Sequence, residues 1–515
     1  MNRYPLGIQT FEEIRKNNQY YVDKTDLIYN IVKGSKNNFL SRPRRFGKSL
    51  LVTTMQAYFE GKKDLFKGLA IEKLEKEWVK YPVIHIDLSS GKYYEVQRIM
   101  STLDFLLSRY ELKYDITPRD LSGFGDRFNN IIQTAAAQTG QKVVVLIDEY
   151  DAPMLDSNAK PEQQEQIRSI MRDFFSPLKA NEGLLRFVFL TGITKFSQLS
   201  IFSELNNIKN YSLDDEFGAI CGFTQEEILS TFHEGIHEMA KANGLTIEQT
   251  VAKMKEQYDG YRFTPHCPNI YNPYSVLNAL HDKKFSNYWF ATGTPTFLLE
   301  LLIKNDIEMP QLEGIVATED QFDSPTDNIG NPIPVLYQSG YLTIKDYDEG
   351  IYTLGYPNEE VRMGLNRSML NYIAPQYGLK TTAFAAQFRA AMRKDDIDTA
   401  MKVLQSFLAA FPYDIHHNRE DYFQAILFTI FITLGFTIHA EVKTARGRID
   451  LLISTKTTIF VMELKIDQSA EKALEQIDAK DYTLPYKHDG RRIFKVGVNF
   501  STEKRTVDEW RYEEA

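Results

Sequence analysis

Residues 41–49 read Ser-Arg-Pro-Arg-Arg-Phe-Gly-Lys-Ser and lie between an apolar run, Asn38–Ser41, and a helical pattern. A Gly-Lys-Ser triplet at a strand-to-helix turn is typical of a phosphate-binding loop. In such a loop the backbone N–H groups surround phosphate oxygens, the lysine reaches the outer phosphates and the hydroxyl binds Mg²⁺. The N-terminus of the following helix also favours anions. We therefore expect Gly47, Lys48 and Ser49 to bind a nucleotide, with Ser49 as a ligand of Mg²⁺.

Three arginines give this loop an unusual composition. Arg42 stands where the general pattern has its first glycine, and Arg44 and Arg45 follow within the loop. We expect these cationic side chains to replace part of the backbone cradle that a glycine-rich loop supplies, and so to contribute to nucleotide binding. On this view Arg42→Gly restores the general pattern and is tolerated.

A second motif follows about a hundred residues later. The apolar run Val143–Ile147 ends in two adjacent acids, Asp148 and Glu149, which is the pattern of a Walker B strand. Asp148 is expected to hold Mg²⁺ through water, and Glu149 to polarise the water that attacks ATP. Each motif alone has an ordinary alternative, a capped strand or a turn with a solvated lysine, but the two in this order favour an ATPase.

The run Phe187–Thr191 ends in a threonine. Thr191 is our candidate for the polar residue that senses the nucleotide. The alternative is a threonine that simply ends a strand.

The spacing of apolar runs predicts an α/β multidomain protein. Residues 1–215 are expected to form a P-loop NTPase domain around a parallel sheet, with these strand runs: Asn38–Ser41, Val83–Leu88, Val143–Ile147 and Phe187–Thr191. Residues 216–365 read as a helical lid and a winged-helix-like region, in which Val335–Leu336 and Tyr341–Ile344 suggest turns and a short hairpin. Residues 366–410 read as a helical connector and residues 411–515 as a second α/β domain.

This second domain carries a hairpin with acidic residues. Its strand runs are Gly447–Ile453 and Thr458–Lys465, and a turn between residues 456 and 457 places Asp450 opposite Glu463. Lys465 lies two residues further along the same face. Two carboxylates and a lysine on one sheet face suit a metal-dependent phosphodiesterase, in which the carboxylates are oxygen ligands for Mg²⁺. An exposed ion pair across a hairpin is the alternative.

Several motifs resemble the bacterial AAA-ATPase-like family, which usually carries a C-terminal PD-(D/E)xK nuclease-like domain of restriction-endonuclease type. They are Tyr20–Thr25, Ser41–Ser49, Leu146–Asp151, Thr191-Gly192, Phe202-Ser203, Asn206-Asn207, Cys221–Thr224 and Tyr258–Phe263. The resemblance covers essentially the whole chain and implies ATP and Mg²⁺ as cofactors. It also implies a catalytic set in the C-terminal domain, with Glu420 and Gln476 as auxiliary members: Asp450, Glu463, Lys465, Glu420 and Gln476.

Composition limits the remaining possibilities. The chain has 515 residues, a net charge of −9 and only two cysteines, Cys221 and Cys267, which disfavours a disulfide scaffold and fits a reducing cytoplasm. The sequence shows neither a signal peptide nor an apolar run long enough to cross a membrane. We expect a cytoplasmic protein with ATP and DNA as its partners, and whether it forms a homo-oligomer stays open.

The leading hypothesis is an ATP-binding and ATP-hydrolysing protein coupled to a Mg²⁺-dependent DNA nuclease domain. The alternative is a nucleotide-dependent switch whose C-terminal domain binds nucleic acid or a protein partner without cleaving. The sequence leaves open ATP against GTP, the DNA structure that is cut and the biological pathway.

Overall fold

In the computed structural model the chain forms two compact units. The chain passes from one unit to the other three times, and each passage is called a crossing. One unit contains Met1–Ala291 and Val316–Glu360, and the other contains Thr292–Ile315 and Val361–Ala515. The described residues are 3–89, 93, 95–117, 123–155, 161–195, 208–290, 296–305, 307, 309–326, 331–373, 378–408, 437–444, 447–455, 457–504 and 506–515. The finer division into four domains stays a prediction.

The first unit is built on a parallel sheet of the predicted kind. Its strands are β1 Asn37–Ser41, β2 Val83–Asp87, β3 Val143–Asp148, β4 Leu185–Gly192 and β5 Ile208–Asn210, in the order β2-β3-β4-β1-β5. All four neighbouring pairs are parallel, so each strand brings its carboxyl end to the same edge. The four predicted strands are confirmed. The short edge strand β5, with the sequence Ile-Lys-Asn, was not predicted, because it has no apolar pattern.

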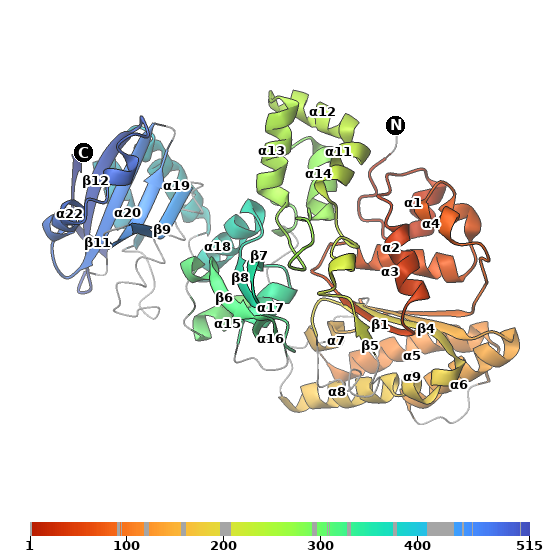
Figure 1. Ribbon diagram of the computed structural model, residues 1–515. Helices are drawn as coiled ribbons and strands as arrows, with labels where there is room; N and C mark the ends of the chain where they lie inside the picture. The colour runs from red at the N-terminus through yellow and green to blue at the C-terminus, as the bar shows by residue number, and fades with distance from the viewer. Residues whose placement is uncertain are drawn as a thin grey trace. The chain divides into compact units, whose positions relative to one another are not determined.

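Helices cover both faces of this sheet, which explains the continuous apolar runs of its strands. They are α1 Phe11–Lys16, α2 Thr25–Lys33, α3 Lys48–Phe59, α4 Ala70–Leu74, α5 Val96–Lys113, α6 Phe124–Thr139, α7 Ala152–Leu155, α8 Pro161–Phe175 and α9 Pro177–Ala180. Figure 1 shows α2 and α3 on one face, and α5, α6, α8 and α9 on the other. Every residue of β3 is buried. The core therefore holds the carboxyl ends of β1 and β3 in place, where the two nucleotide motifs begin.

The middle of the chain contains a helical group and a small mixed region. The helices of the group are α11 Gln225–Thr231, α12 His233–Asn243, α13 Ile247–Tyr258 and α14 Pro273–Asp282. The mixed region contains α16 Glu319–Phe322, α17 Ile333–Gln338, β6 Ile315–Thr318, β7 Thr343–Asp348 and β8 Ile351–Gly355, with the sheet order β6-β8-β7. The predicted turn or hairpin at Val335–Leu336 is wrong, because these residues lie in α17, where prolines occupy the first turn. The hairpin is formed by β7 and β8.

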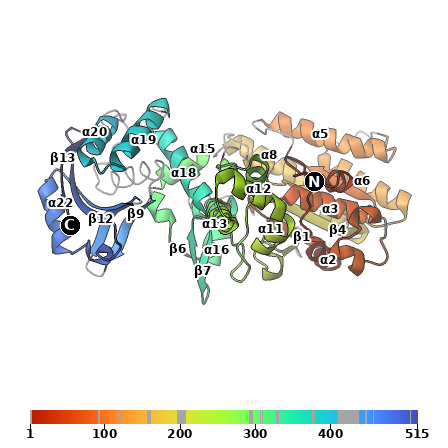
Figure 2. The same cartoon turned by 90° about the horizontal axis from the view of Figure 1, so that it is seen from above.

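The second unit contains a five-stranded mixed sheet in the order β13-β12-β11-β10-β9. Its elements are α15 Thr296–Lys304, α19 Gly378–Met392, α20 Ile397–Leu408, β9 Thr437–Thr444, β10 Gly447–Ser454, β11 Thr458–Ile466, α22 Ala470–Ala479, β12 Arg492–Ser501 and β13 Thr506–Glu514, and α18 Glu359–Ile373 leads into it. Helix α22 packs against β11 and β12, and α20 packs against β13 (Figure 2). β10 pairs with β11 in the predicted register, Leu451 opposite Met462.

No helix in the described ranges is both long and apolar enough to span a membrane.

Candidate nucleotide and nuclease sites

The phosphate-binding loop adopts a conformation suited to anions. Gly47 has φ +95° and is the N-cap of α3, which begins at Lys48. Arg45, two residues earlier, also has a left-handed backbone, with φ +68°. A left-handed turn before a helix turns successive N–H groups toward one side, where they and the helix N-terminus attract phosphate.

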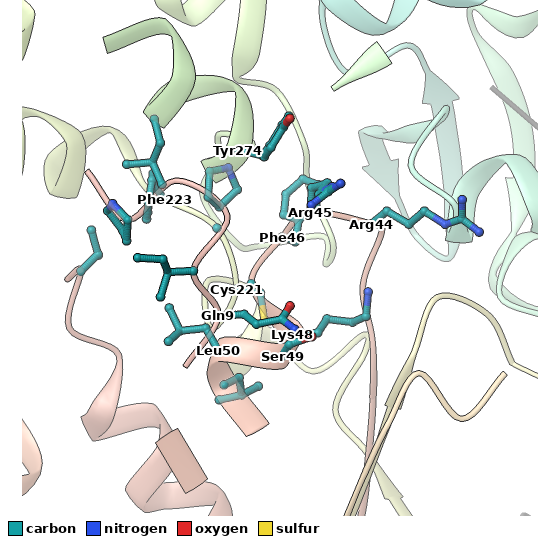
Figure 3. A pocket seen from close by; sticks show the side chains of 18 of the residues that line it. Gln9, Arg44, Arg45, Phe46, Lys48, Ser49, Leu50, Cys221, Phe223 and Tyr274 are labelled. Atoms are coloured by element: carbon teal, nitrogen blue, oxygen red, sulfur yellow. The ribbon is translucent and has the colours of Figure 1, made fainter. Parts of the chain in front are cut away.

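A cavity of about 750 Å³ opens over this loop. Its lining belongs to the first unit and includes residues 5–9, 20–22, 44–51 and 220–223, together with Glu149, Pro273, Tyr274, Leu277 and Asn278. Figure 3 shows Lys48 and Ser49 at the loop, with Phe223 and Tyr274 from the helical region nearby. The volume suits a ligand the size of a nucleotide, and apolar side chains such as Leu6, Ile8 and Phe223 suit a base. The lining therefore combines the residues of the phosphate-binding loop with apolar side chains.

The two nucleotide motifs meet inside this cavity. Lys48 Nζ lies 3.1 Å from Glu149 Oε1 and donates to the Pro43 carbonyl at 3.3 Å. Only 3% of Lys48 is exposed. Glu149 has φ +51°, a strained value for a residue with a Cβ. The lysine thus pairs with the predicted catalytic acid.

The residues predicted to hold Mg²⁺ are adjacent. Ser49 neighbours the Asp148 carboxyl, and burial and the neighbouring Glu149 raise the pKa of Asp148 to about 7. Asp148 Oδ1 is buried without a hydrogen-bond partner among the described residues. A divalent cation would give this oxygen a partner and favour the charged carboxylate, so the donor set fits Mg²⁺.

Arg42 does not take part in this site, which corrects the expectation that it binds the nucleotide. It is 2% exposed and is not among the described residues that line the cavity. Its guanidinium donates to the carbonyls of Ser41, Ser212 and Phe217 at 2.9 to 3.0 Å, and it lies 4.4 Å above the Phe263 ring. Arg42 therefore holds three backbone segments together, and we expect Arg42→Gly to be destabilising and not tolerated.

Arg44 and Arg45 do line the cavity, and aromatic residues from outside the loop contact Arg45 and Phe46. The Arg45 guanidinium lies 4.8 Å above the Tyr274 ring. Phe46 is buried against Tyr261 and Phe263, with ring centroids 4.7 and 5.3 Å apart. The loop thus owes its shape to side-chain packing.

Arg42→Ala should destabilise the first unit strongly. The substitution leaves three buried carbonyls without their donor, and an unpaired buried acceptor costs about 1–3 kcal/mol. We therefore expect the free energy of unfolding to fall by about 3–5 kcal/mol. Urea unfolding measures it, followed by tryptophan fluorescence, to which Trp78, Trp289 and Trp510 all contribute. The exposed Arg44 provides the matched control: Arg44→Ala should change the free energy of unfolding by less than about 0.5 kcal/mol and weaken nucleotide binding. Equal midpoints for the two variants would contradict the structural role of Arg42.

Thr191 also lies away from the cavity, contrary to its predicted role as a sensor. It is fully buried, and its hydroxyl donates to the Leu40 carbonyl on β1 at 2.7 Å. Thr191 therefore ties β4 to β1 and is not among the described residues lining the cavity.

Asp151 is a polar residue to which sequence reasoning assigned no role. Its Oδ2 accepts hydrogen bonds from the Ile193 and Thr194 N–H groups and from the Thr194 hydroxyl, at 2.7 to 2.9 Å. The Tyr150 hydroxyl donates to the Thr194 carbonyl at 2.8 Å. The residues after β3 thus hold the segment after β4, and the signal was the third acid, Asp151, in Asp-Glu-Tyr-Asp at 148–151.

Asp151→Ala should destabilise this edge of the sheet by about 2–4 kcal/mol, because three buried donors lose their acceptor. Asp151→Asn is the matched variant, since its amide oxygen still accepts from the two N–H groups. We expect the loss of unfolding free energy in Asp151→Asn, measured by urea unfolding, to be less than half of the loss in Asp151→Ala. A loss as large for Asn as for Ala would show that charge, and not the hydrogen bonds, matters.

The C-terminal unit brings four of its five predicted site residues together. Asp450 Oδ2 accepts from the Leu464 N–H at 2.9 Å. Lys465 Nζ lies 3.3 Å from Glu463 Oε1, and the Gln476 amide donates to the same oxygen. Gln476 comes from α22 and the others from β10 and β11. The fifth residue, Glu420, lies outside the described residues.

Glu463 is the most buried member of this group, with 1% exposed. Burial and the neighbouring Asp450 raise its pKa to about 8. Its Oε2 has no hydrogen-bond partner in the part of the chain that the structure describes. A divalent cation between Asp450 and Glu463 would reverse this effect, so the pair fits a metal. In the described ranges, no group of three or more His, Cys, Asp or Glu side chains is placed to hold a metal ion.

Comparisons with known proteins match both units. A family model described as predicted AAA-ATPase matches residues 5–202, and a model of the PD-(D/E)XK nuclease superfamily matches residues 418–510. The "Uncharacterized protein in vnfD 5'region" of Azotobacter chroococcum mcd 1 is 32% identical over 519 residues and covers 98% of each chain.

Solved structures show a weaker similarity. The ORC2 protein of Aeropyrum pernix is 10% identical, with a TM-score of 0.26, covering 67% of this chain and 93% of its own. The ORC1 protein of the same organism, in complex with DNA, is 10% identical with a TM-score of 0.23, covering 66% and 90%. The full-length relative and the two domain matches show that this chain belongs to the bacterial AAA-ATPase-like family and carries a PD-(D/E)XK nuclease superfamily domain.

Proposed function

We propose that this protein binds and hydrolyses ATP in its first unit, and that the nucleotide state controls a Mg²⁺-dependent nuclease in its second unit that cuts DNA. The observation that carries the proposal is the pairing of Lys48 with Glu149 beside Ser49 and Asp148, in a cavity large enough for a nucleotide. The two buried free thiols, Cys221 and Cys267, suit a reducing cytoplasm.

Lys48 and Glu149 suggest how ATP binding prepares hydrolysis. The γ-phosphate competes with Glu149 for the lysine, because a phosphate carries more charge than a carboxylate. Glu149 is then released to accept a proton from the attacking water. The new P–O bond to water forms as the bond to ADP breaks, and phosphate leaves. Mg²⁺ held by Ser49 and through Asp148 would neutralise charge on the phosphates.

The C-terminal group supports hydrolysis of a phosphodiester. Lys465 lies beside Glu463, and in this proposal it stabilises the developing charge or orients a water. Gln476 holds Glu463 from the side of α22. Mg²⁺ bound by Asp450 and Glu463 would act as a Lewis acid on the phosphate.

One matrix of assays tests the proposal. Purified protein is incubated with supercoiled, linear and branched DNA, each with and without Mg²⁺ and ATP, and phosphate release and DNA cleavage are both measured. Mg²⁺-dependent cleavage that changes with ATP supports the proposal. Phosphate release with DNA binding but without cleavage under any condition favours the alternative, a nucleotide-dependent switch that binds without cutting. Absence of nucleotide binding contradicts both.

A further inference from the structure

Glu360 is a buried carboxylate at the start of α18, and only 1% of it is exposed. Its Oε1 accepts from the Trp289 N–H at 2.8 Å, and its Oε2 accepts from the Ser275 hydroxyl at 2.6 Å. A buried carboxylate is costly unless its oxygens are satisfied, so its partners are held firmly. Neither nucleotide motif contains any of these residues.

One partner reaches the phosphate-binding loop. The Trp289 indole Nε1 donates to the Arg44 carbonyl at 3.1 Å. The Trp289 ring is 6% exposed and packs edge-on against Tyr341, with centroids 5.3 Å apart. Glu360 therefore connects to the main chain of the loop through a single residue, Trp289.

The other partner reaches the cavity through α14. Ser275 belongs to the first turn of α14, next to Tyr274. Tyr274 lines the cavity, and the Arg45 guanidinium lies 4.8 Å above its ring (Figure 3). Glu360 is thus linked to the loop at two neighbouring residues, Arg44 through Trp289 and Arg45 through α14.

Glu360, Trp289 and Ser275 form a hydrogen-bonded cluster, two of whose members lie close to the points where the chain passes between the units. Glu360 is the last residue of the first unit, and α18 continues into the second unit as far as Ile373. Trp289 lies two residues before Ala291, where the chain leaves the first unit for the first time. Two of the three crossings between the units therefore begin at one hydrogen-bonded cluster, and that cluster contacts the phosphate-binding loop.

We propose that Glu360 is a positioning residue that couples nucleotide occupancy of the cavity to the second unit. When phosphate draws the loop at Arg44 and Arg45, Trp289 and α14 shift together, because one carboxylate holds both. The first turn of α18 carries that carboxylate, so the helix follows. The inference rests on the proposed nucleotide binding and adds the route by which it reaches the second unit.

Hydrogen exchange at saturating nucleotide tests the coupling. The full-length protein is measured with and without a non-hydrolysable ATP analogue, after binding of a fluorescent analogue has been titrated for each variant. In the wild type we expect exchange in residues 361–373 to slow at least about threefold on binding, which corresponds to a modest allosteric coupling.

Three variants separate positioning from a general structural role. Glu360→Ala should remove the nucleotide-dependent change in residues 361–373 while the analogue still saturates the cavity. Glu360→Gln should retain most of it, because the amide oxygen can accept from Trp289 and the amide NH₂ can donate to the Ser275 hydroxyl. Trp289→Phe keeps an aromatic ring but lacks the donor to Arg44, and should also reduce the change. Glu256→Ala, an exposed glutamate on α13, is the control and should behave as wild type.

The outcomes are distinguishable. If the wild type binds the analogue without any change in residues 361–373, or if Glu360→Ala shows the wild-type change, the coupling through Glu360 is wrong and nucleotide binding stands. If the wild type binds no nucleotide, the proposed function fails and this inference with it. If Glu360→Ala does not fold, the comparison of Glu360→Gln with Trp289→Phe tests the coupling. If both variants lose the nucleotide-dependent change in exchange equally, the expectation that Glu360→Gln retains it is wrong.

Discussion

Lys48→Ala is expected to lower kcat/KM for ATP by about 10²–10³-fold, the usual cost of removing a charged group from a developing phosphate charge. The lysine lies inside the cavity, 3.1 Å from Glu149. Its loss also leaves Glu149 beside the buried Asp148 without its cation. Phosphate release and binding of a fluorescent ATP analogue measure the two effects.

Glu149→Gln separates the two roles at this site. It keeps the size of the side chain and still lets Lys48 approach, so nucleotide affinity should stay within about threefold while kcat falls about 10²-fold, as for loss of a general base. Lys63→Ala, an exposed lysine outside the cavity, should behave as wild type. Wild-type turnover in Lys48→Ala would show that the loop does not bind the phosphates.

Asp450→Asn is expected to lower Mg²⁺-dependent DNA cleavage by about 10³-fold, because losing a metal ligand removes several kcal/mol of transition-state stabilisation. The substitution keeps the acceptor for the Leu464 N–H, at 2.9 Å in the structure, and removes only the charge. DNA binding should persist, since phosphate contacts do not depend on this carboxylate. Cleavage is followed on supercoiled DNA, and binding by anisotropy.

Stability without metal provides a second measurement for this variant. Asp450 raises the pKa of Glu463, so removing the Asp450 charge relieves repulsion between the pair. We expect Asp450→Asn to be as stable as wild type without metal, or slightly more stable. Glu475→Ala, an exposed acid on α22, is the control and should retain cleavage. Equal cleavage by wild type and Asp450→Asn would assign the activity to another site or to a contaminant.

Local patterns were sufficient for the parts of the fold that depend on neighbours in the chain. The strands β1 to β4 were predicted because a strand buried on both faces is a continuous apolar run. The register of β10 and β11 was predicted because a short turn determines which residues pair. The same pattern missed β5 and assigned Val335–Leu336 to a turn or hairpin, since neither short segment has a clear period.

The candidate site residues also fall into two groups, those that local sequence placed at the cavity and those whose side chains bond elsewhere. Lys48, Ser49, Asp148 and Glu149 were found from sequence because each follows a strand at the same edge of a parallel sheet, where their meeting is a matter of topology. Arg42 and Thr191 were assigned to the nucleotide from the same neighbourhood. Their side chains instead donate to carbonyls of distant segments, such as Phe217 for Arg42.

What the sequence by itself determined is therefore the phosphate-binding loop, the paired acids and the hairpin with Asp450 and Glu463, because spacing along a strand or turn places these groups. Only the tertiary structure decided which polar side chains face the cavity and which are buried and hydrogen-bonded to other segments. Arg42, Asp151 and Glu360 each satisfy backbone or hydroxyl groups brought from other parts of the chain. A buried polar group takes whatever partner the packing supplies, and long-range packing leaves no period or motif in the sequence around that group.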